Sequence, residues 1–470
     1  MEFLLEQLGL DRPINAGSDI GKGDLEEGSG ELFDGDFPGA VVIERLGHVP
    51  SFSLGRGRTF QRSDSRAISG QRLPQRRLGL HELLESLIEP GREEVAWADV
   101  AAVLTVGKFC GQASELGIAE SWYARTALED IAGIPAEAVN DDRLYRALDK
   151  VGAHKDRLCE HLMERYRSWF GVDFEFLLYD VTSTYFEGLA EGNEKAARGY
   201  SRDHRGDCKQ VCIGLVCTPE GLPLNFEVFA GNRTDVTTVG DMVRKMEERF
   251  GKAERVWVMD RGMVSEGNIS LLSERKALYL VGTPKSHLRA YEAELVRDEE
   301  GRAIALELSC PVKEGEHPTL AKGAYLLRTN CTETDPAKLW RWYMQLTQAE
   351  AAFRTAKSDI GLRPVYHQKT ERVEAHLLVC FLSLALWRTL EMWMNGKGLG
   401  SSARKLVEAV GTIRSMDLSV PVRRGNRTVK LNLRTVAKPD PDVALLLAHL
   451  GLRLPKGSRL VENVVEKTTP

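Results

Sequence analysis

The segment FEFLLYDVTSTYFEG, residues 174–188, is a run of apolar, aromatic and β-branched residues interrupted by one acid, Asp180. Such runs are typical of buried strands. Four more strand-like runs follow, with two helix-like runs between the later ones, so the order is three strands, helix, strand, helix, strand. The strands are KQVCIGLVC (209–217), LNFEVFAG (224–231), RVWVMD (255–260) and ALYLVGT (277–283), and the helices are TTVGDMVRKMEERFG (237–251) and EGNISLLSERK (266–276). This order predicts an α/β fold, in which a mixed sheet is flanked by helices.

Two acids stand at or near the ends of these apolar runs. Asp180 lies in the first run and Asp260 closes the fourth, RVWVMD. Because an unpaired buried carboxylate costs several kcal/mol, an acid in such a place needs a partner or a metal ion.

A third acid, Glu350, lies in the stretch from Trp342 to His376, which has helical spacing. With 3.6 residues per turn, Tyr343, Arg354 and Lys357 fall on the same helix face as Glu350. Two strand acids and one helix acid form a suitable ligand set for hard divalent cations. The alternative interpretation of the helix alone is an ordinary i,i+4 salt bridge from Glu350 to Arg354.

Length and composition describe a globular chain with several domains. The 470 residues are 43% hydrophobic and 28% charged, and no apolar run reaches the roughly 20 residues that span a membrane. We expect a reducing, cytoplasmic setting, because eight cysteines in this length do not make a disulfide scaffold. The net charge of −5 offers no global attraction for nucleic acid, so DNA binding would require local basic patches.

Four regions follow from the patterning. Residues 1–77 have little periodicity and predict a flexible arm, Gly- and Asp-rich at first and Arg-rich from 55 to 77. The Arg-rich half suits either a phosphate backbone or a solvated linker. Residues 78–170 are helical throughout and predict a compact domain that binds a DNA end. The acid-bearing core is expected at 171–395 with a β insertion at about 285–335, and a C-terminal region at 396–470 is expected to dimerise or contact DNA.

The motifs around the three acids resemble a known family, the bacterial insertion-sequence DDE transposases. Specifically, the chain resembles the group with the Y-x2-R-x3-E-x6-K signature around the third acid. Tyr343, Glu350 and Lys357 match this signature, whereas Leu346 stands at the arginine position. YDVTSTYFEG and VMDRGMVSEGN resemble the family's first- and second-acid motifs, and the segment 199–238 resembles the sequence between them. The similarity runs from about Leu78 to about Leu454.

The resemblance implies a ribonuclease-H-like catalytic core that cuts transposon-end DNA and joins it to target DNA. It implies that Asp180, Asp260 and Glu350 hold two Mg²⁺ or Mn²⁺ ions. It further implies that Tyr343 and Lys357 hold a neighbouring phosphate. In place of the signature arginine, Arg354 or Arg341 could supply a guanidinium to the DNA. Arg261, beside Asp260, is expected either to contact DNA or to form a salt bridge with a nearby acid. The implied partners are double-stranded DNA, both terminal repeats and target, and a second copy of the chain on that DNA, with no membrane. A bacterial protein of this kind works at the nucleoid.

Three alternatives remain open on sequence grounds. One is a metal-dependent nuclease on the same core, which cuts but does not join. Another is an inactive relic that only binds element ends. Leu346 at the signature position and the unusual N-terminal arm speak weakly for this alternative, and the intact acids speak against it. A hydrolase of small phosphate esters fits least, because it has no use for the helical domain and the basic arm.

Overall fold

The computed structural model describes residues 78–126, 128–252, 255–283, 295–297, 303–306, 327–333, 335–424, 427–450, 452, 454 and 458–465. The expected flexible arm, residues 1–77, lies outside the described residues. So does most of the expected β insertion at 285–335.

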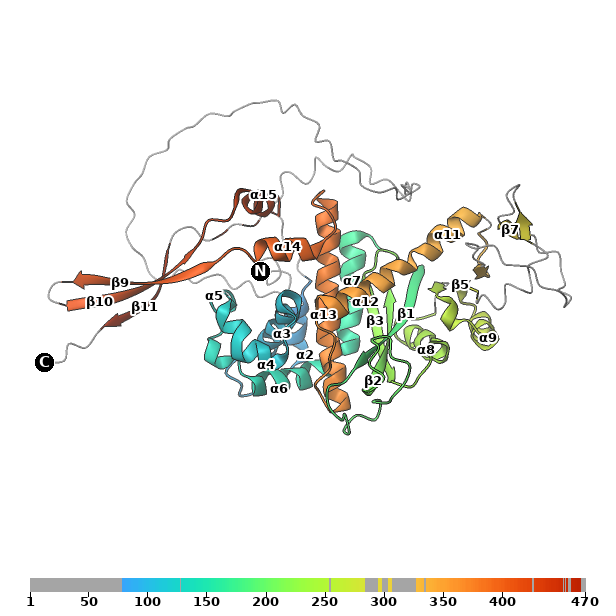
Figure 1. The fold of residues 1–470 in the computed structure, drawn as a ribbon, viewed down its shortest axis with the longest axis horizontal. Coiled ribbons are helices and arrows are strands. Elements are labelled where there is room, and N and C mark those ends of the chain that lie inside the picture. The colour runs from blue at the N-terminus through green and yellow to red at the C-terminus, as the bar shows by residue number, and fades with distance from the viewer. Residues whose placement is uncertain are drawn as a thin grey trace, which may run out of the picture. The chain divides into compact units, whose positions relative to one another are not determined.

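The centre of the described chain is a six-stranded mixed sheet in the order β3-β2-β1-β4-β5-β8 (Figure 1). Antiparallel pairs join β3 to β2 and β2 to β1, parallel pairs join β1 to β4 and β4 to β5, and β8 is antiparallel to β5. The strands are β1 (Phe176–Tyr185), β2 (Gln210–Cys217), β3 (Pro223–Ala230), β4 (Val256–Met259), β5 (Leu278–Gly282) and β8 (Leu327–Thr329).

This topology confirms the predicted fold class. A meander of three antiparallel strands, continued by parallel strands on the other side of the first, is a ribonuclease-H-like arrangement. All five strands expected between 174 and 283 form, because β2, β3 and β4 are buried almost throughout and their runs are rich in β-branched and aromatic residues.

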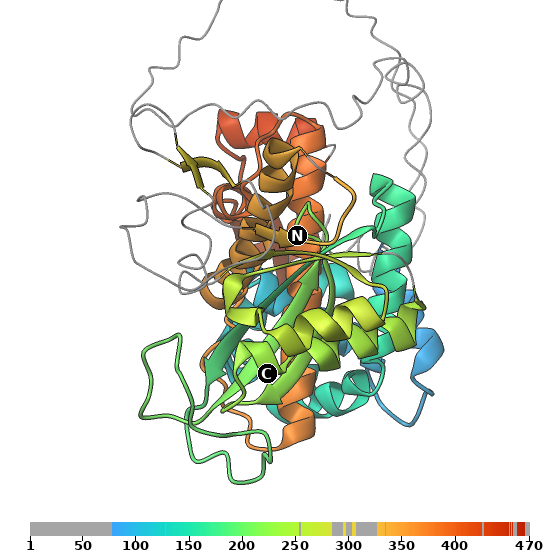
Figure 2. The same ribbon diagram turned by 90° about the vertical axis from the view of Figure 1, so that its right-hand side faces the viewer.

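Helices cover both faces of the sheet. Figure 2 shows α8 (Val239–Phe250) and α9 (Glu266–Glu274) in front of the strands, on the face opposite α12 (Leu346–Ser358) and α13 (Thr370–Gly396). The helix α12 packs on β1 and β2, and α13 packs on β3. A shorter helix, α11 (Pro336–Met344), precedes α12 and contacts β4 and β5.

The helix α13 connects the sheet to the N-terminal helices. It packs against α3 and α6 on one side and β3 on the other. The α-helices of the N-terminal region are α2 (Leu80–Leu87), α3 (Trp97–Gly111), α4 (Glu115–Gly117), α5 (Leu128–Ala132), α6 (Asp141–Gly152) and α7 (Lys155–Phe170). By length and composition α13 could cross a membrane, but its most apolar stretch is 78% buried inside the protein, which makes it a core helix.

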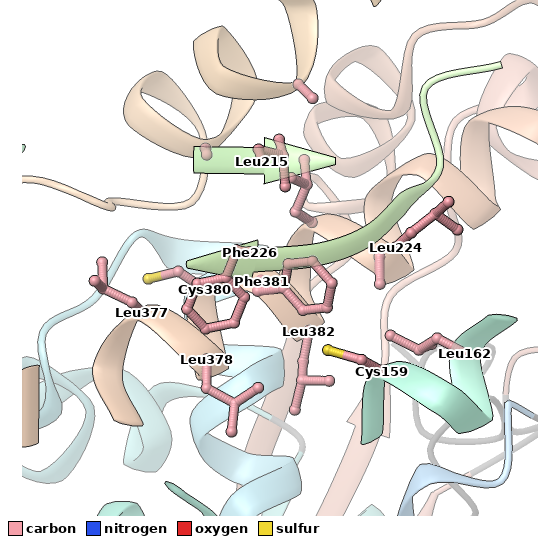
Figure 3. Packing of buried hydrophobic residues seen from close by; sticks show 14 of the residues in the cluster. Cys159, Leu162, Leu215, Leu224, Phe226, Leu377, Leu378, Cys380, Phe381 and Leu382 are labelled. Atoms are coloured by element: carbon pink, nitrogen blue, oxygen red, sulfur yellow. The ribbon is translucent and has the colours of Figure 1, made fainter. Parts of the chain in front are cut away.

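The core lies where α7, β2, β3 and α13 meet (Figure 3). The rings of Phe226 on β3 and Phe381 on α13 lie 5.0 Å apart between centroids, an arrangement typical of packed aromatic pairs. Cys159 and Cys380, which are among the free cysteines, are buried in the same cluster. This packing fixes the sheet on which the acids stand.

The remaining elements lie outside this core. A two-stranded pair, β6 (Leu295–Arg297) and β7 (Ala303–Leu306), falls in the region of the expected insertion. The C-terminal elements are α14 (Ala403–Val410), β9 (Ser415–Arg424), β10 (Arg427–Val436), α15 (Pro441–Leu450) and β11 (Arg459–Val465), and their strands form a separate sheet in the order β11-β10-β9.

Candidate metal centre and its surroundings

The pairing of β1 with β4 brings the first two predicted acids together. These strands are parallel, and Tyr179 is in register with Met259. The next residue along each chain is Asp180 and Asp260. Because neighbours in register on parallel strands point to the same face of a sheet, the two carboxylates belong to one side of it. Asp260 also begins the short 3₁₀ turn Arg261–Met263, which ends the strand.

The third acid, Glu350, lies near enough to Asp180 to influence its pKa. Burial raises the pKa of Asp180 to about 7. The Val181 amide and the Arg202 guanidinium oppose this increase, and the negative charges of Glu350 and Asp260 add smaller contributions to it. Glu350 itself is exposed on α12, which packs on β1. Within the described residues, none of the three carboxylates forms an ion pair. Such a group of acids is a suitable ligand set for divalent cations.

Tyr343 approaches this site from a different element than expected. The stretch from Trp342 to His376 is not one helix, because α11 ends at Met344 and α12 begins at Leu346, with Gln345 between them. The prediction that Tyr343 shares a helix stripe with Glu350 is therefore wrong. The Tyr343 hydroxyl instead donates to Asp260 Oδ1 at 3.2 Å, so the tyrosine meets the acids through a tertiary contact.

The close packing of Tyr343 depends on Gly282 at the end of β5. A Cβ atom on Gly282 would lie 2.4 Å from the Tyr343 hydroxyl oxygen and 3.1 Å from the carbon that bears it. We therefore expect Gly282→Ala to push the phenol from Asp260 and to slow DNA cleavage about as much as Tyr343→Phe, roughly 5- to 10-fold for one lost hydrogen bond. Single-turnover cleavage rates measure the effect.

Gly267→Ala is the matched control for this prediction. Gly267 lies in α9, and the nearest atom to a Cβ added there would be Ser265 Oγ, at an ordinary contact distance of 3.9 Å. Unchanged cleavage by Gly282→Ala protein of normal thermal stability would contradict the role given to Tyr343.

The predicted phosphate-binding Lys357 is held by a residue that the sequence did not single out. Its ammonium lies 2.9 Å from Asp203 Oδ1, and Arg363 Nη1 donates to the same oxygen. Asp203 is 3% exposed, and its other carboxylate oxygen is buried without a hydrogen-bond partner. Burial is the main cause that lowers the pKa of Lys357, with Arg363 and Arg202 adding to it and Asp203 opposing it. The segment 199–238 was matched only as part of the family resemblance, so nothing in its pattern marked Asp203.

The other predicted DNA-contacting residues lie on the surface. Arg354 and Arg261 are both exposed, and neither forms an ion pair within the described part of the chain, so the alternative of a Glu350–Arg354 salt bridge is wrong. Leu346, at the arginine position of the signature, is 6% exposed and belongs to the hydrophobic core. A guanidinium at that position would be buried, so the leucine serves packing.

A second cluster of ligand-type side chains lies away from the three acids. Glu115, His367 and His376 bring their ligand atoms within 4.8 Å of one another, all buried. However, the Lys108 ammonium, 2% exposed, lies 3.7 Å from Glu115 Oε1, and His376 Nδ1 lies 3.0 Å from the same oxygen. Although burial alone would raise it, His376 and Lys108 hold the pKa of Glu115 well below its usual range. Because Lys108 already balances the carboxylate, we interpret this cluster as a buried polar network between α3, α4 and α13.

The comparisons with known proteins agree with the acid-bearing core. Residues 173–386 match the family model of the transposase DDE domain. These residues therefore form a transposase DDE domain, and the resemblance to DDE transposases is confirmed for this part of the chain.

Solved structures give weaker similarity. A piggyBac transposase synaptic complex with hairpin DNA shares 13% identity, with 70% of this chain and 73% of that chain covered and a TM-score of 0.40. A Mos1 transposase paired-end complex with the left transposon end also shares 13% identity, covering 41% of this chain and 60% of that chain at a TM-score of 0.17. No curated protein matches the chain.

Proposed function

We propose that this chain cuts the ends of an insertion sequence and joins them to target DNA, with Asp180, Asp260 and Glu350 as the catalytic carboxylates. The proposal is supported by the register of β1 and β4, which puts Asp180 and Asp260 on one side of the sheet, and by the packing of α12, which carries Glu350, on β1. They come from β1, the end of β4 and α12, three elements that all lie within the transposase DDE domain.

The three carboxylates would hold two Mg²⁺ or Mn²⁺ ions, because they supply only hard oxygen ligands. Such ions, when bound, activate an attacking oxygen and stabilise a leaving one. The protein's own residues then have separate roles. Tyr343 fixes the orientation of the Asp260 carboxylate through its hydroxyl, and Lys357, Arg354 and Arg261 would bind phosphates of the DNA on either side of the reacting bond.

In this mechanism the same site acts twice. A water molecule first cuts the DNA at the element end and frees a 3′-hydroxyl group. That hydroxyl then attacks a target phosphorus, which forms a phosphodiester bond between the element end and the target and releases a 3′-hydroxyl group of the target strand. Double-stranded DNA, as terminal repeats and as target, is thus the proposed partner. We also propose that two copies of the chain assemble on the DNA, so that both ends of the element are joined together.

A strand-transfer assay separates this function from its alternatives. A labelled, pre-cut duplex from the DNA that flanks the coding sequence is incubated with supercoiled plasmid, the full-length protein and Mg²⁺. We expect labelled joined products that are absent with Asp260→Asn protein. Cleavage of an uncut duplex without joining would identify a nuclease, and binding with neither reaction would identify an inactive DNA-binding protein.

A further inference from the structure

The position of Leu346 raises the question of which residue presents a guanidinium beside Lys357. Arg341 lies on α11 and has an acid nearby, with its Nη2 3.9 Å from Asp335 Oδ2. Arg354 is exposed on the same helix as Lys357, but no described contact fixes its direction. Only Arg363 is joined to Lys357 within the described residues, because the two cations share one oxygen of Asp203.

The backbone holds Arg363 against the end of β1, the strand that carries Asp180. The Thr184 hydroxyl donates to the carbonyl of Leu362, the residue before Arg363. Two residues on, the amide of Val365 donates to the Tyr185 carbonyl at 2.9 Å, and the Glu187 amide donates to the Val365 carbonyl at 2.9 Å. The backbone on both sides of Arg363 is thus hydrogen-bonded to the end of β1, which fixes the point from which its side chain extends.

The charges around this pair link it to the acids. Arg202 lies near enough to both Asp180 and Lys357 to lower the pKa of each. It is neutralised by Asp235, whose Oδ1 lies 2.5 Å from its Nη2. Lys357 and Arg363 together carry two positive charges against the single charge of Asp203. These three side chains therefore carry one net positive charge, held between α12, which carries Glu350, and the end of β1, which carries Asp180.

Both cations also keep free hydrogen-bond donors. Arg363 commits Nη1 to Asp203, and a guanidinium has five N–H groups in all. At 36% exposure its side chain reaches solvent, whereas Lys357 is 12% exposed and Asp203 only 3%. A phosphate could accept from both cations without displacing Asp203. Planar guanidinium groups bind phosphate oxygens in pairs, which a lone ammonium cannot do.

We infer that Arg363 is a DNA-phosphate-binding residue that acts with Lys357, and that Asp203 is the positioning residue that holds the two side chains together. Arg363 then supplies the guanidinium that the buried Leu346 does not. This inference rests on the proposed function, because it takes the ligand to be the DNA that the acids cut.

The test measures how DNA affinity depends on salt. Each phosphate contact contributes a slope of about −0.9 to the logarithm of affinity against the logarithm of salt concentration. A fluorescent duplex from the DNA flanking the coding sequence is titrated with full-length protein by anisotropy, without divalent cations and at several KCl concentrations. We expect Arg363→Gln to flatten the slope by about 0.9 and to weaken binding several-fold at low salt.

Arg244→Gln is the matched control. Arg244 is an exposed arginine on α8 that, among the described residues, pairs with Asp241 and Glu248 of its own helix, so its replacement makes the same charge change elsewhere. The inference is overturned if Arg363→Gln and Arg244→Gln give the same slope as the unmodified protein.

A double variant removes two further ambiguities. Asp203→Asn/Arg363→Gln has the same net charge as the unmodified protein. Because the Asp203 carboxylate is also removed, no buried carboxylate loses its partner arginine. We expect its slope to be flatter by about 0.9 or more, because Lys357 also loses its positioning partner. An unchanged slope overturns the inference, including in the case where Arg363→Gln alone fails to fold.

The outcome for the proposed function is read separately. Failure of the unmodified protein to bind the duplex or to cut it with Mg²⁺ counts against the proposed function itself. Normal binding and cutting by the unmodified protein, with an unaltered salt slope in the Arg363 variants, counts only against the role of Arg363.

Discussion

Asp180→Asn, Asp260→Asn and Glu350→Gln are each expected to reduce DNA cleavage about a thousandfold or more, while leaving the affinity for an end duplex within a few-fold of normal. The reason is that the three residues act together, so an enzyme that lacks any one of them loses most of its activity. The measurement is single-turnover cleavage of a labelled duplex in Mg²⁺, with binding followed separately in its absence.

Glu248→Gln provides the control for these substitutions. Glu248 is exposed on α8, and within the described residues its ion pair is with Arg244, four residues earlier in the helix, so its loss is expected to leave cleavage unchanged. Substantial cleavage by any one of the three acid variants would remove that acid from the proposed catalytic set.

Asp180→Asn is also expected to stabilise the metal-free protein, and to do so more strongly at alkaline than at acidic pH. The pKa of Asp180 is raised from 3.8 to about 7 by burial and by its two acidic neighbours. Between these pH values the folded protein keeps a proton that the unfolded chain has released, so folding loses stability as the pH rises through this interval. Above about pH 7 the whole cost is present, and we expect the substitution to recover about 1–3 kcal/mol, since the site is partly open to solvent.

Thermal denaturation at about pH 8 and about pH 4.5 measures this effect, which amounts to a few degrees in melting temperature at the higher pH. Mg²⁺ added at about a hundred times its dissociation constant should stabilise the unmodified protein by about 2.7 kcal/mol. It should stabilise Asp180→Asn protein much less. Equal melting temperatures for the two proteins at the higher pH would show that the folded protein does not raise the pKa of Asp180.

The sheet and the two strand acids were predictable because local pattern governs them. Strands β1 to β5 follow apolar runs that match buried positions, and Asp180 and Asp260 stand out as acids within or beside those runs. The fold class follows from the order of the elements alone. These features depend on nearest neighbours along the chain, which a single sequence records.

The features that the sequence did not predict depend on tertiary contacts. Gln345 separates α11 from α12 although neither Gly nor Pro marks the break, so Tyr343 reaches Asp260 from a second helix. Asp203 meets Lys357 across 154 residues, a distance at which no spacing rule applies. The polar network around Glu115 was missed for the same reason.

The most direct test of the central claim is a titration of the protein with Mn²⁺, followed by the electron paramagnetic resonance signal of the free ion. The account predicts that the unmodified protein binds Mn²⁺ and that Asp180→Asn, Asp260→Asn and Glu350→Gln each weaken this binding, whereas Glu248→Gln does not. Mn²⁺ binding that is unaffected by the loss of Glu350, or of either aspartate, would contradict the claim that the three carboxylates share one metal centre.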